Sequence, residues 1–423
     1  MPPQDFRLFR NVIIADAATS NTTSQVGEPS VANNGKWIFL SGNWYASLSL
    51  DNGVTWSYVD PYTTFPAASG GFCCDQVVLY DPSRDLLFWL LQYVNDANRN
   101  TLRLATARGS NLASNSWYWY DFTPDGVNSS WTKQWFDYPD LALSNNYLYI
   151  TSNMFMINGG WTRSVVLRLS LDQLAAGAGL NYNYYESTTH GSLKCTQGAR
   201  DIMYFGAHNS LSSVRVFSWP EATTSVSWND VNISSWSDAT RVAPGPDGRD
   251  WCGRADGRIT GGWVANGVIG FMWSAAQTPP SRPFPYVKVV RIREATKTLI
   301  DQPDIWSVTS AWIYPSVCPN DRGHVGLSIF YGGGSLYPSH AVGIWDDYST
   351  GWTTFTTRTG THGPNTNKWG DYIACRRHAP DGLTWIATGF TEQGGTVGGN
   401  IEPRFIHFGR RRDENAVNRW SSS

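Results

Sequence analysis

The sequence predicts an all-β fold, a single seven-bladed β-propeller spanning residues 1–423, and three observations carry that prediction. Seven units share one order: a polar opening residue, a short apolar strand, a turn, a second strand, and a third strand after another turn. Gly 40 and Pro 22 supply many turns. Only residues 171–177 read as helix, for one or two turns. A β-sandwich is the structural alternative, but seven similar units favour radial repetition, which leaves few free sheet edges.

The first unit shows the arrangement most clearly. Its three strands are expected at 29–32, 37–40 and 45–50, each bounded by Asn, Gly or Ser. In the later units the third strands are expected at 101–109, 164–172, 213–221, 286–294, 340–347 and 402–409. The polar tail 410–423 is expected to lie on the surface. The seven units open near Glu28, Asp75, Asp140, His190, Asp256, Ser310 and Asp371.

A turn motif follows the third strand of the first unit. Ser49, Asp51, Gly53 and Trp56 match the pattern S-x-D-x-G-x-x-W, the Asp-box. We expect Asp51 to cap backbone N–H groups of a hairpin turn, Gly53 to take the left-handed conformation, and Trp56 to pack between neighbouring sheets. The motif therefore marks a fold and performs no chemistry.

With Glu28-Pro-Ser and the Trp-Gly-Asp-Tyr that ends at Tyr372, the Asp-box resembles the BNR-repeat, sialidase-like propeller superfamily. The resemblance covers most of residues 25–408 as architecture and is specific at those three places. It implies carbohydrate chemistry at one mouth of the central channel. A sialidase of this superfamily is expected to carry three arginines, a Tyr–Glu pair, an Asp acid/base and an early Arg-Ile-Pro. The chain has no Arg-Ile-Pro, so sialidase activity itself is not expected.

The opening residues suggest a catalytic mouth, because the first strand of each propeller blade lines the channel. His190, Asp75, Asp256 and Asp371 are the candidate catalytic residues, and Glu28 and Asp140 are candidates for substrate binding. A carboxylate pair or a histidine of near-neutral pKa can transfer a proton to or from a sugar. The structural alternative is that these side chains cap turns at strand ends.

Further candidates for substrate binding lie near blade ends. A guanidinium clamps a carboxylate with two parallel hydrogen bonds, and aromatic rings stack on sugars. His190 with Arg254 would meet the needs of a lyase, which requires a base and a cation. The remaining candidates are Arg258, Arg200, His208, Trp369 and Tyr372.

The composition of the chain limits the kinds of partner that it is expected to bind. A net charge of −2 argues against a nucleic-acid ligand, and no apolar run is long enough to span a membrane. The N-terminus lacks an apolar signal core, so we expect either a cytoplasmic protein or a secreted one whose signal is absent from this chain. Three N-x-S/T sequons weakly favour secretion. Of the six cysteines, the adjacent Cys73 and Cys74 read either as buried thiols or as a strained bridge.

We therefore expect a carbohydrate-active enzyme, a glycoside hydrolase or polysaccharide lyase that acts on an acidic or complex glycan. No metal site or cofactor is expected. A ring of carboxylates suits a structural Ca²⁺, although the chain has no D-x-D-x-D loop. The alternatives are a non-catalytic lectin, which needs equivalent pockets on several blades, and an interaction scaffold. The sequence leaves the oligomeric state open.

Overall fold

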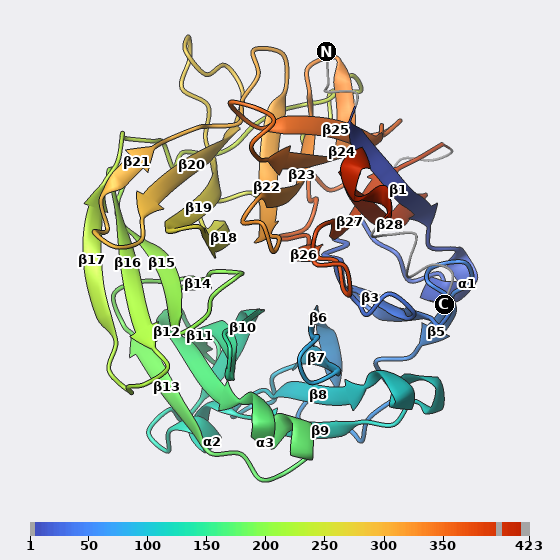
Figure 1. The fold of residues 1–423 in the computed structure, drawn as a ribbon, viewed down its shortest axis with the longest axis vertical. Helices are drawn as coiled ribbons and strands as arrows, with labels where there is room; N and C mark the ends of the chain where they lie inside the picture. The colour runs from blue at the N-terminus through green and yellow to red at the C-terminus, as the bar shows by residue number, and fades with distance from the viewer. Residues whose placement is uncertain (1–4, 395–399, 416–423) are drawn as a thin grey trace.

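The chain forms a closed ring of seven four-stranded antiparallel sheets, as shown in a computed structural model that describes residues 5–394 and 400–415. Figure 1 shows the sheets as blades around a central channel, in chain order from blue to red. The predicted all-β, seven-bladed propeller is thereby confirmed. In six blades the strands follow one another along the chain, from the channel to the rim.

The blades are built as follows. Blade 1 contains β2 (Ser30–Asn33), β3 (Ile38–Gly42), β4 (Tyr45–Ser49) and β5 (Ser57–Val59), and blade 2 contains β6 (Phe72–Asp81), β7 (Leu86–Tyr93), β8 (Leu102–Arg108) and β9 (Tyr118–Phe122). Blade 3 contains β10 (Gln134–Leu143), β11 (Tyr147–Met156), β12 (Trp161–Ser170) and β13 (Tyr182–Ser187), and blade 4 contains β14 (Lys194–Cys195), β15 (Ile202–Ser210), β16 (Ser213–Pro220) and β17 (Ser227–Asn232). Blade 5 contains β18 (Ile259–Ala265), β19 (Val268–Ala275), β20 (Tyr286–Arg293) and β21 (Leu299–Asp301), and blade 6 contains β22 (Ala311–Pro319), β23 (Val325–Gly333), β24 (Leu336–Trp345) and β25 (Thr353–Arg358). Blade 7 contains β26 (Cys375–Arg377), β27 (Trp385–Glu392), β28 (Ile401–Arg410) and, as its outer strand, β1 (Phe6–Ile13).

Blade 7 is completed by the two ends of the chain. Strand β1 pairs antiparallel with β28, from Phe6 opposite Arg410 to Ile13 opposite Arg404 (Figure 1). The sequence analysis assigned no strand before Glu28, because β1 belongs to no three-strand unit. Because the outer strand of blade 7 comes from the start of the chain, backbone hydrogen bonds join the two ends of the chain and close the ring.

Short helices lie between some strands. They are α1 (Asp16–Thr19), α2 (Pro124–Val127), α3 (Leu171–Ala176) and the 3₁₀ turns η1 (Gly109–Ser114) and η2 (Arg411–Asp413). Helix α3 is the one that the sequence predicts: Ser170 accepts from the Gln173 N–H at its start, and Gly177 ends it with φ +62°. In the described part of the chain, no helix has both the length and the apolar character needed to span a bilayer.

The Asp-box forms the β4–β5 hairpin turn as predicted. The Asp51 carboxylate accepts hydrogen bonds from the backbone N–H groups of Val54 and Thr55, at 3.1 and 2.8 Å. Hydrogen bonds from Thr55 are the main reason that the pKa of Asp51 falls to about 2. Gly53 has φ +83°, and the Trp56 ring contacts Phe405 of blade 7 with centroids 6.0 Å apart.

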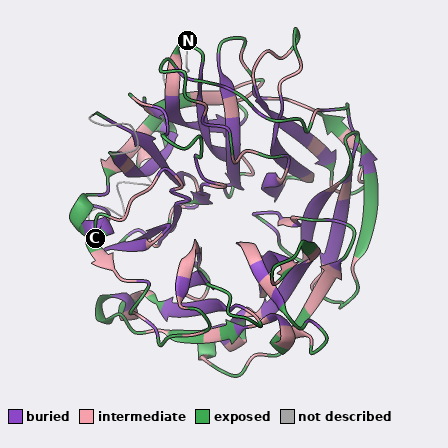
Figure 2. Cartoon of the chain, turned by 180° about the vertical axis from the view of Figure 1, so that it is seen from behind, coloured by how far each residue is buried: buried purple, intermediate pink, exposed green. Residues whose placement is uncertain are grey.

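The hydrophobic core lies between neighbouring blades, and Figure 2 shows buried residues through the strands and exposed residues mainly along the rim and loops. Between blades 4 and 5, for example, Phe205, Phe217 and Phe271 belong to one apolar cluster, and the first two rings stack at 4.8 Å. Each blade buries both faces in this way, which explains why β3, β7, β23 and β27, the second strands of their blades or of the closing sheet, are buried at every position.

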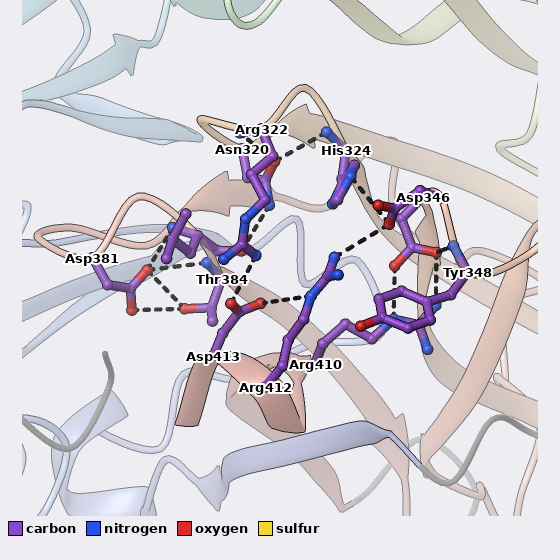
Figure 3. A network of polar contacts seen from close by, with 12 residues as sticks. Asn320, Arg322, His324, Asp346, Tyr348, Asp381, Thr384, Arg410, Arg412 and Asp413 are labelled. Atoms are coloured by element: carbon purple, nitrogen blue, oxygen red, sulfur yellow. Dashed lines mark hydrogen bonds and ion pairs between the residues drawn. The ribbon is translucent and has the colours of Figure 1, made fainter. Parts of the chain in front are cut away.

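The start of the tail is fixed to blade 6 by an ionic network (Figure 3). Arg410 donates two hydrogen bonds to Asp346, at 2.7 and 2.9 Å, and both side chains are essentially inaccessible to solvent. Asp413 pairs with Arg322 at 2.7 Å. The expectation of a solvated tail is therefore wrong for Arg410 and Asp413. Residues 416–423 lie outside the described part of the chain.

We predict that Arg410→Ala lowers the free energy of unfolding by about 3–5 kcal/mol, because it leaves the Asp346 charge buried without its partner. Urea denaturation at pH 7 measures this change. The control is Arg99→Ala, which removes a half-exposed pair with Asp125 and should cost at most about 1 kcal/mol. Equal losses in the two variants would show that the buried Arg410–Asp346 pair matters no more to stability than an exposed one.

Candidate active site

The residues before and at the start of the inner strands converge on one end of the channel. We call this end the carboxylate mouth and define it by Glu28, Asp75, Asp137, Asp256 and Asp371. Asp371 acts electrostatically on both Glu28 and Asp75, and Asp137 acts on Asp75. Asp256 in turn acts on Asp371. Residues from blades 2 and 3 and from three connecting segments therefore share one site.

Irregular strand pairing points several side chains toward this mouth. The β6–β7 pairing slips between Phe72 and Gln76, so Cys73, Cys74 and Asp75 lie in a bulge, and the two cysteines are joined as a disulfide. The β10–β11 pairing slips around Tyr138, and the β22–β23 pairing slips around Tyr314. These two tyrosines have φ +55° and +58°, a strained conformation for a bulky residue. Bulges and strain of this kind gather at functional sites.

Two arginines hold Asp371. Arg254 contacts one carboxylate oxygen at 3.2 Å and Arg258 the other at 3.1 Å. Arg258 also pairs with Asp256 at 2.6 Å. Burial raises the pKa of Asp371, and the two guanidinium groups oppose that rise by favouring the ionised form.

Glu28 joins the first and last blades beneath this arginine pair. Its Oε1 accepts from the Asp371 backbone N–H at 2.9 Å, and its Oε2 accepts from the Asn43 amide at 2.8 Å. Glu28 itself has φ +43° and is buried. Burial, reinforced by the negative charges of Asp75 and Asp371, raises the pKa of Glu28 well above its usual range.

Asp75 differs from its neighbours because its carboxyl group has no hydrogen bond or ion pair with any residue that the structure describes. Burial first, and then the negative charges of Asp137 and Asp371, raise the pKa of Asp75 to about 7. Arg254 and Arg258 oppose this rise without touching the group. Asp75 therefore exchanges a proton near neutral pH, as a general acid or base must.

Three tyrosines surround the carboxylates. The Arg258 guanidinium lies 4.2 Å from the Tyr138 ring centre, and the rings of Tyr138 and Tyr372 meet edge to face at 6.0 Å. Burial raises the pKa of Tyr138, Tyr314 and Tyr372, so their hydroxyls stay protonated. The hydroxyls of Tyr314 and Tyr372 and the Nε of Arg254 are buried without a partner among the described residues. Buried polar groups of this kind usually bond to protein groups or to ordered water.

The structure gathers seven of the predicted residues at this mouth: Glu28, Asp75, Arg254, Asp256, Arg258, Asp371 and Tyr372. Asp140 lies close by and pairs with Lys194. Arg200 is exposed and lines a cavity formed by the opposite ends of the inner strands.

Three other candidates lie away from any ligand surface. His190 is packed against the Phe217 ring beside the outer strands of blade 4, with its Nδ1 hydrogen-bonded to Thr189 at 2.8 Å. Trp369 is 1% exposed and stacks on Phe390, so it supports the loop and has no face free for a sugar. His208 bonds the Gly257 carbonyl through Nε2 at 2.7 Å, and burial lowers its pKa to about 4. His208 therefore positions the loop between the two arginines.

The sequence analysis missed Asp137, Tyr138 and Tyr314. A signal existed: Tyr138-Pro139 and Tyr314-Pro315 interrupt apolar runs, and a proline inside a strand indicates a bulge. The analysis began the third blade at Asp140, past this bulge, whereas β10 begins at Gln134.

Two other groups of three residues bring potential metal ligands within 4.8 Å of one another: His378 with Asp381 and His407, and His324 with Asp346 and Asp347. The His378 and His407 rings lie face to face at 4.0 Å, so their in-plane lone pairs cannot converge on one ion. In the second group Arg410 and Arg412 occupy the carboxylates (Figure 3). At the carboxylate mouth, Arg254 and Arg258 would likewise repel a Ca²⁺ ion near Asp371.

Comparison with known proteins shows similarity of fold alone. Neither a family model nor a curated protein matches the chain. Among solved structures, an α-L-arabinofuranosidase from Fusarium graminearum is similar at 9% identity over 96% of this chain and 99% of that one, with a TM-score of 0.46. A protein of unknown function from Dyadobacter fermentans matches at 11% over 97% and 100%, with a TM-score of 0.48. A Streptococcus pneumoniae sialidase matches at 10% over 96% and 71%, with a TM-score of 0.41.

We predict that Asp75 makes the protein less stable as the pH rises from about 4 to 7. Its pKa is about 7 in the folded protein and near 3.8 when unfolded, so its stabilising effect is complete below pH 4 and is lost as the pH rises through 7. Denaturant unfolding over this range measures the slope. Asp75→Asn should reduce the slope, whereas Asp16→Asn, a change at an exposed carboxyl on α1, should leave it unchanged. An identical slope in Asp75→Asn and the parent would contradict this account.

Proposed function

We propose that the protein is a glycoside hydrolase that acts on a glycan at the carboxylate mouth, with Asp75 as the general acid. The observation that carries the proposal is the pair of contrasting carboxyl groups. Asp75 is unpaired with a pKa of about 7, whereas Asp371 is held by two arginines that favour its ionised form. Burial raises the pKa of Asp371 as well, but its two arginines oppose that rise and Asp75 has no such contact. A protonated carboxyl group beside a carboxylate can serve as the acid and base of glycoside hydrolysis.

In this mechanism Asp75 donates its proton to the oxygen of the leaving sugar. Asp371 is the ionised carboxylate that stabilises the developing positive charge and activates water. Glu28 fixes Asp371 through the backbone N–H of that residue, and so acts as a positioning residue.

The charges favour a neutral glycan over an acidic one. A uronate or sialate needs a free guanidinium for its carboxylate, but Arg254 and Arg258 already pair with Asp371, and Arg258 pairs with Asp256 as well. The excess of carboxylates at the mouth would repel a negatively charged sugar. We therefore expect neutral sugars in place of the acidic glycan that the sequence suggested.

Two other functions receive less support. A lyase needs a base beside a cation, yet His190 lies by the outer strands of blade 4, away from Arg254. Burial raises the pKa of Tyr138 and Tyr372 at the carboxylate mouth, so these hydroxyls stay protonated and are poor bases. A multivalent lectin needs equivalent pockets on several blades, and here residues of different blades converge on one asymmetric mouth. These observations favour hydrolysis at a single site.

The test is a screen of the purified protein against neutral aryl glycosides and plant or bacterial polysaccharides, with release of phenol or reducing sugar as the readout. We predict that Asp75→Asn lowers kcat by about 10²–10⁴-fold, and that kcat/KM of the parent, which reports groups of the free enzyme, falls as the pH rises above about 7, where Asp75 loses its proton. His190→Ala is the matched control and should retain activity.

Three outcomes would contradict the proposal. Unsaturated product absorbing in the ultraviolet would indicate a lyase, because elimination leaves a carbon–carbon double bond and hydrolysis does not. Full activity in Asp75→Asn would remove Asp75 from the mechanism. Retention on a glycan array with no turnover of any substrate would make the protein a lectin.

A further inference from the structure

A cavity lies at the opposite end of the channel, which we call the far mouth. It is formed by the ends of the inner strands and has a volume of about 620 Å³. Among its lining residues are Asn33, Asp81, Gln197, Arg200, Asn320 and Arg376. Asp81 ends the same strand that carries Asp75, six residues further along, which is about 20 Å at the usual rise per residue. The far mouth is therefore distinct from the carboxylate mouth.

Arg376 in the far mouth is a buried cation without a counter-charge. The residue is 8% exposed, and its one hydrogen bond within the described chain is a 3.3 Å contact from Nη1 to the Cys375 carbonyl. Its Nε is fully buried with no partner. Among described residues no carboxylate forms an ion pair with it, whereas the adjacent Arg377 pairs with Asp321. An uncompensated guanidinium at this depth is costly unless an anion or water satisfies it.

No described neighbour of Arg376 pairs with its charge. Burial raises the pKa of Cys318 and Cys375, so both thiols stay protonated. None of the acidic residues that line the cavity forms an ion pair with Arg376 in the described chain: Asp81 pairs with Arg84 and Asp321 with Arg377. Asp201 and Glu294 bond to the neutral amide of Asn145 and the neutral hydroxyl of Tyr204.

We propose that the far mouth binds a small oxyanion, a phosphate or a carboxylate, on the guanidinium of Arg376. The planar guanidinium donates several N–H groups in a fork that matches the oxygens of either anion. The cavity has room for a compound of several heavy atoms around that group. This inference is independent of the hydrolase proposal, because the two sites share no residue and lie at opposite ends of the channel.

The test is isothermal titration calorimetry of the full chain with inorganic phosphate and, separately, malonate, in a chloride-free buffer at pH 7. We expect saturable binding of at least one anion. We also expect a melting temperature that rises by about 1–2 °C when the anion is at tenfold its dissociation constant. Phosphate binding without malonate binding would indicate a tetrahedral ligand, and the reverse a carboxylate.

Arg376→Met and Arg254→Met form the matched pair of variants. Arg376→Met should bind neither anion, and it should melt no lower than the parent in anion-free buffer, because it removes a buried charge that has no partner. Arg254→Met, at the carboxylate mouth, should bind as the parent does. Binding that persists in Arg376→Met, or absence of binding of both anions by the parent, would overturn the proposal.

Discussion

The candidate active site depends on the seam where the ring closes. Strand β1 pairs with β28, and the chain then passes from blade 7 through α1 to Glu28, at the start of blade 1. There Glu28 accepts hydrogen bonds from the Asp371 backbone of blade 7 and from Asn43 of blade 1. The buried carboxyl group of Glu28 thus connects two segments that are far apart in the sequence. Its hydrogen bond from the Asp371 backbone helps to fix the position of Asp371.

The chemistry of the mouth follows from crowding acidic groups in a partly buried space. Each added carboxylate raises the cost of ionising the others, so the protons are shared unequally. Arginines decide the outcome locally: Asp371 has two in contact, whereas Asp75 has none. At the far mouth the pairing of charges leaves Arg376 without a carboxylate in contact, because Asp81 and Asp321 pair with other arginines.

The sequence was sufficient for the fold and for most of the carboxylate mouth. Turn residues and seven apolar units predicted the blades, and strand-start positions led to Asp75 and Asp371, because short-range patterning encodes both. Pairing between strands that are far apart in the sequence leaves no such local pattern. Strand β1 pairs with β28, which is almost the whole chain away in sequence. The bulges at Tyr138 and Tyr314 insert extra residues into a strand, and a search for regular alternation does not detect them.

His190 shows a further limit of reasoning from spacing. It occupies the place in the fourth unit where five of the other six units carry a carboxylate, yet β14 begins only at Lys194 and consists of two residues. The additional residues of the connection leave His190 beside the outer strands, against Phe217. In the same way, the aromatic character of Trp369 did not reveal whether its ring faces a ligand or Phe390, since burial is decided by tertiary packing.

The most direct test of the account is the protonation state of Asp75 in the folded protein. Carbon-13 NMR titration of the aspartate carboxyl groups would measure it, with Asp75→Asn used to assign the signal. The account predicts one aspartate that titrates near pH 7 and whose resonance is missing from the variant. If the Asp75 signal instead titrates below about pH 5, as an ordinary aspartate does, the carboxylate mouth holds no neutral acid and the mechanism proposed for it is wrong.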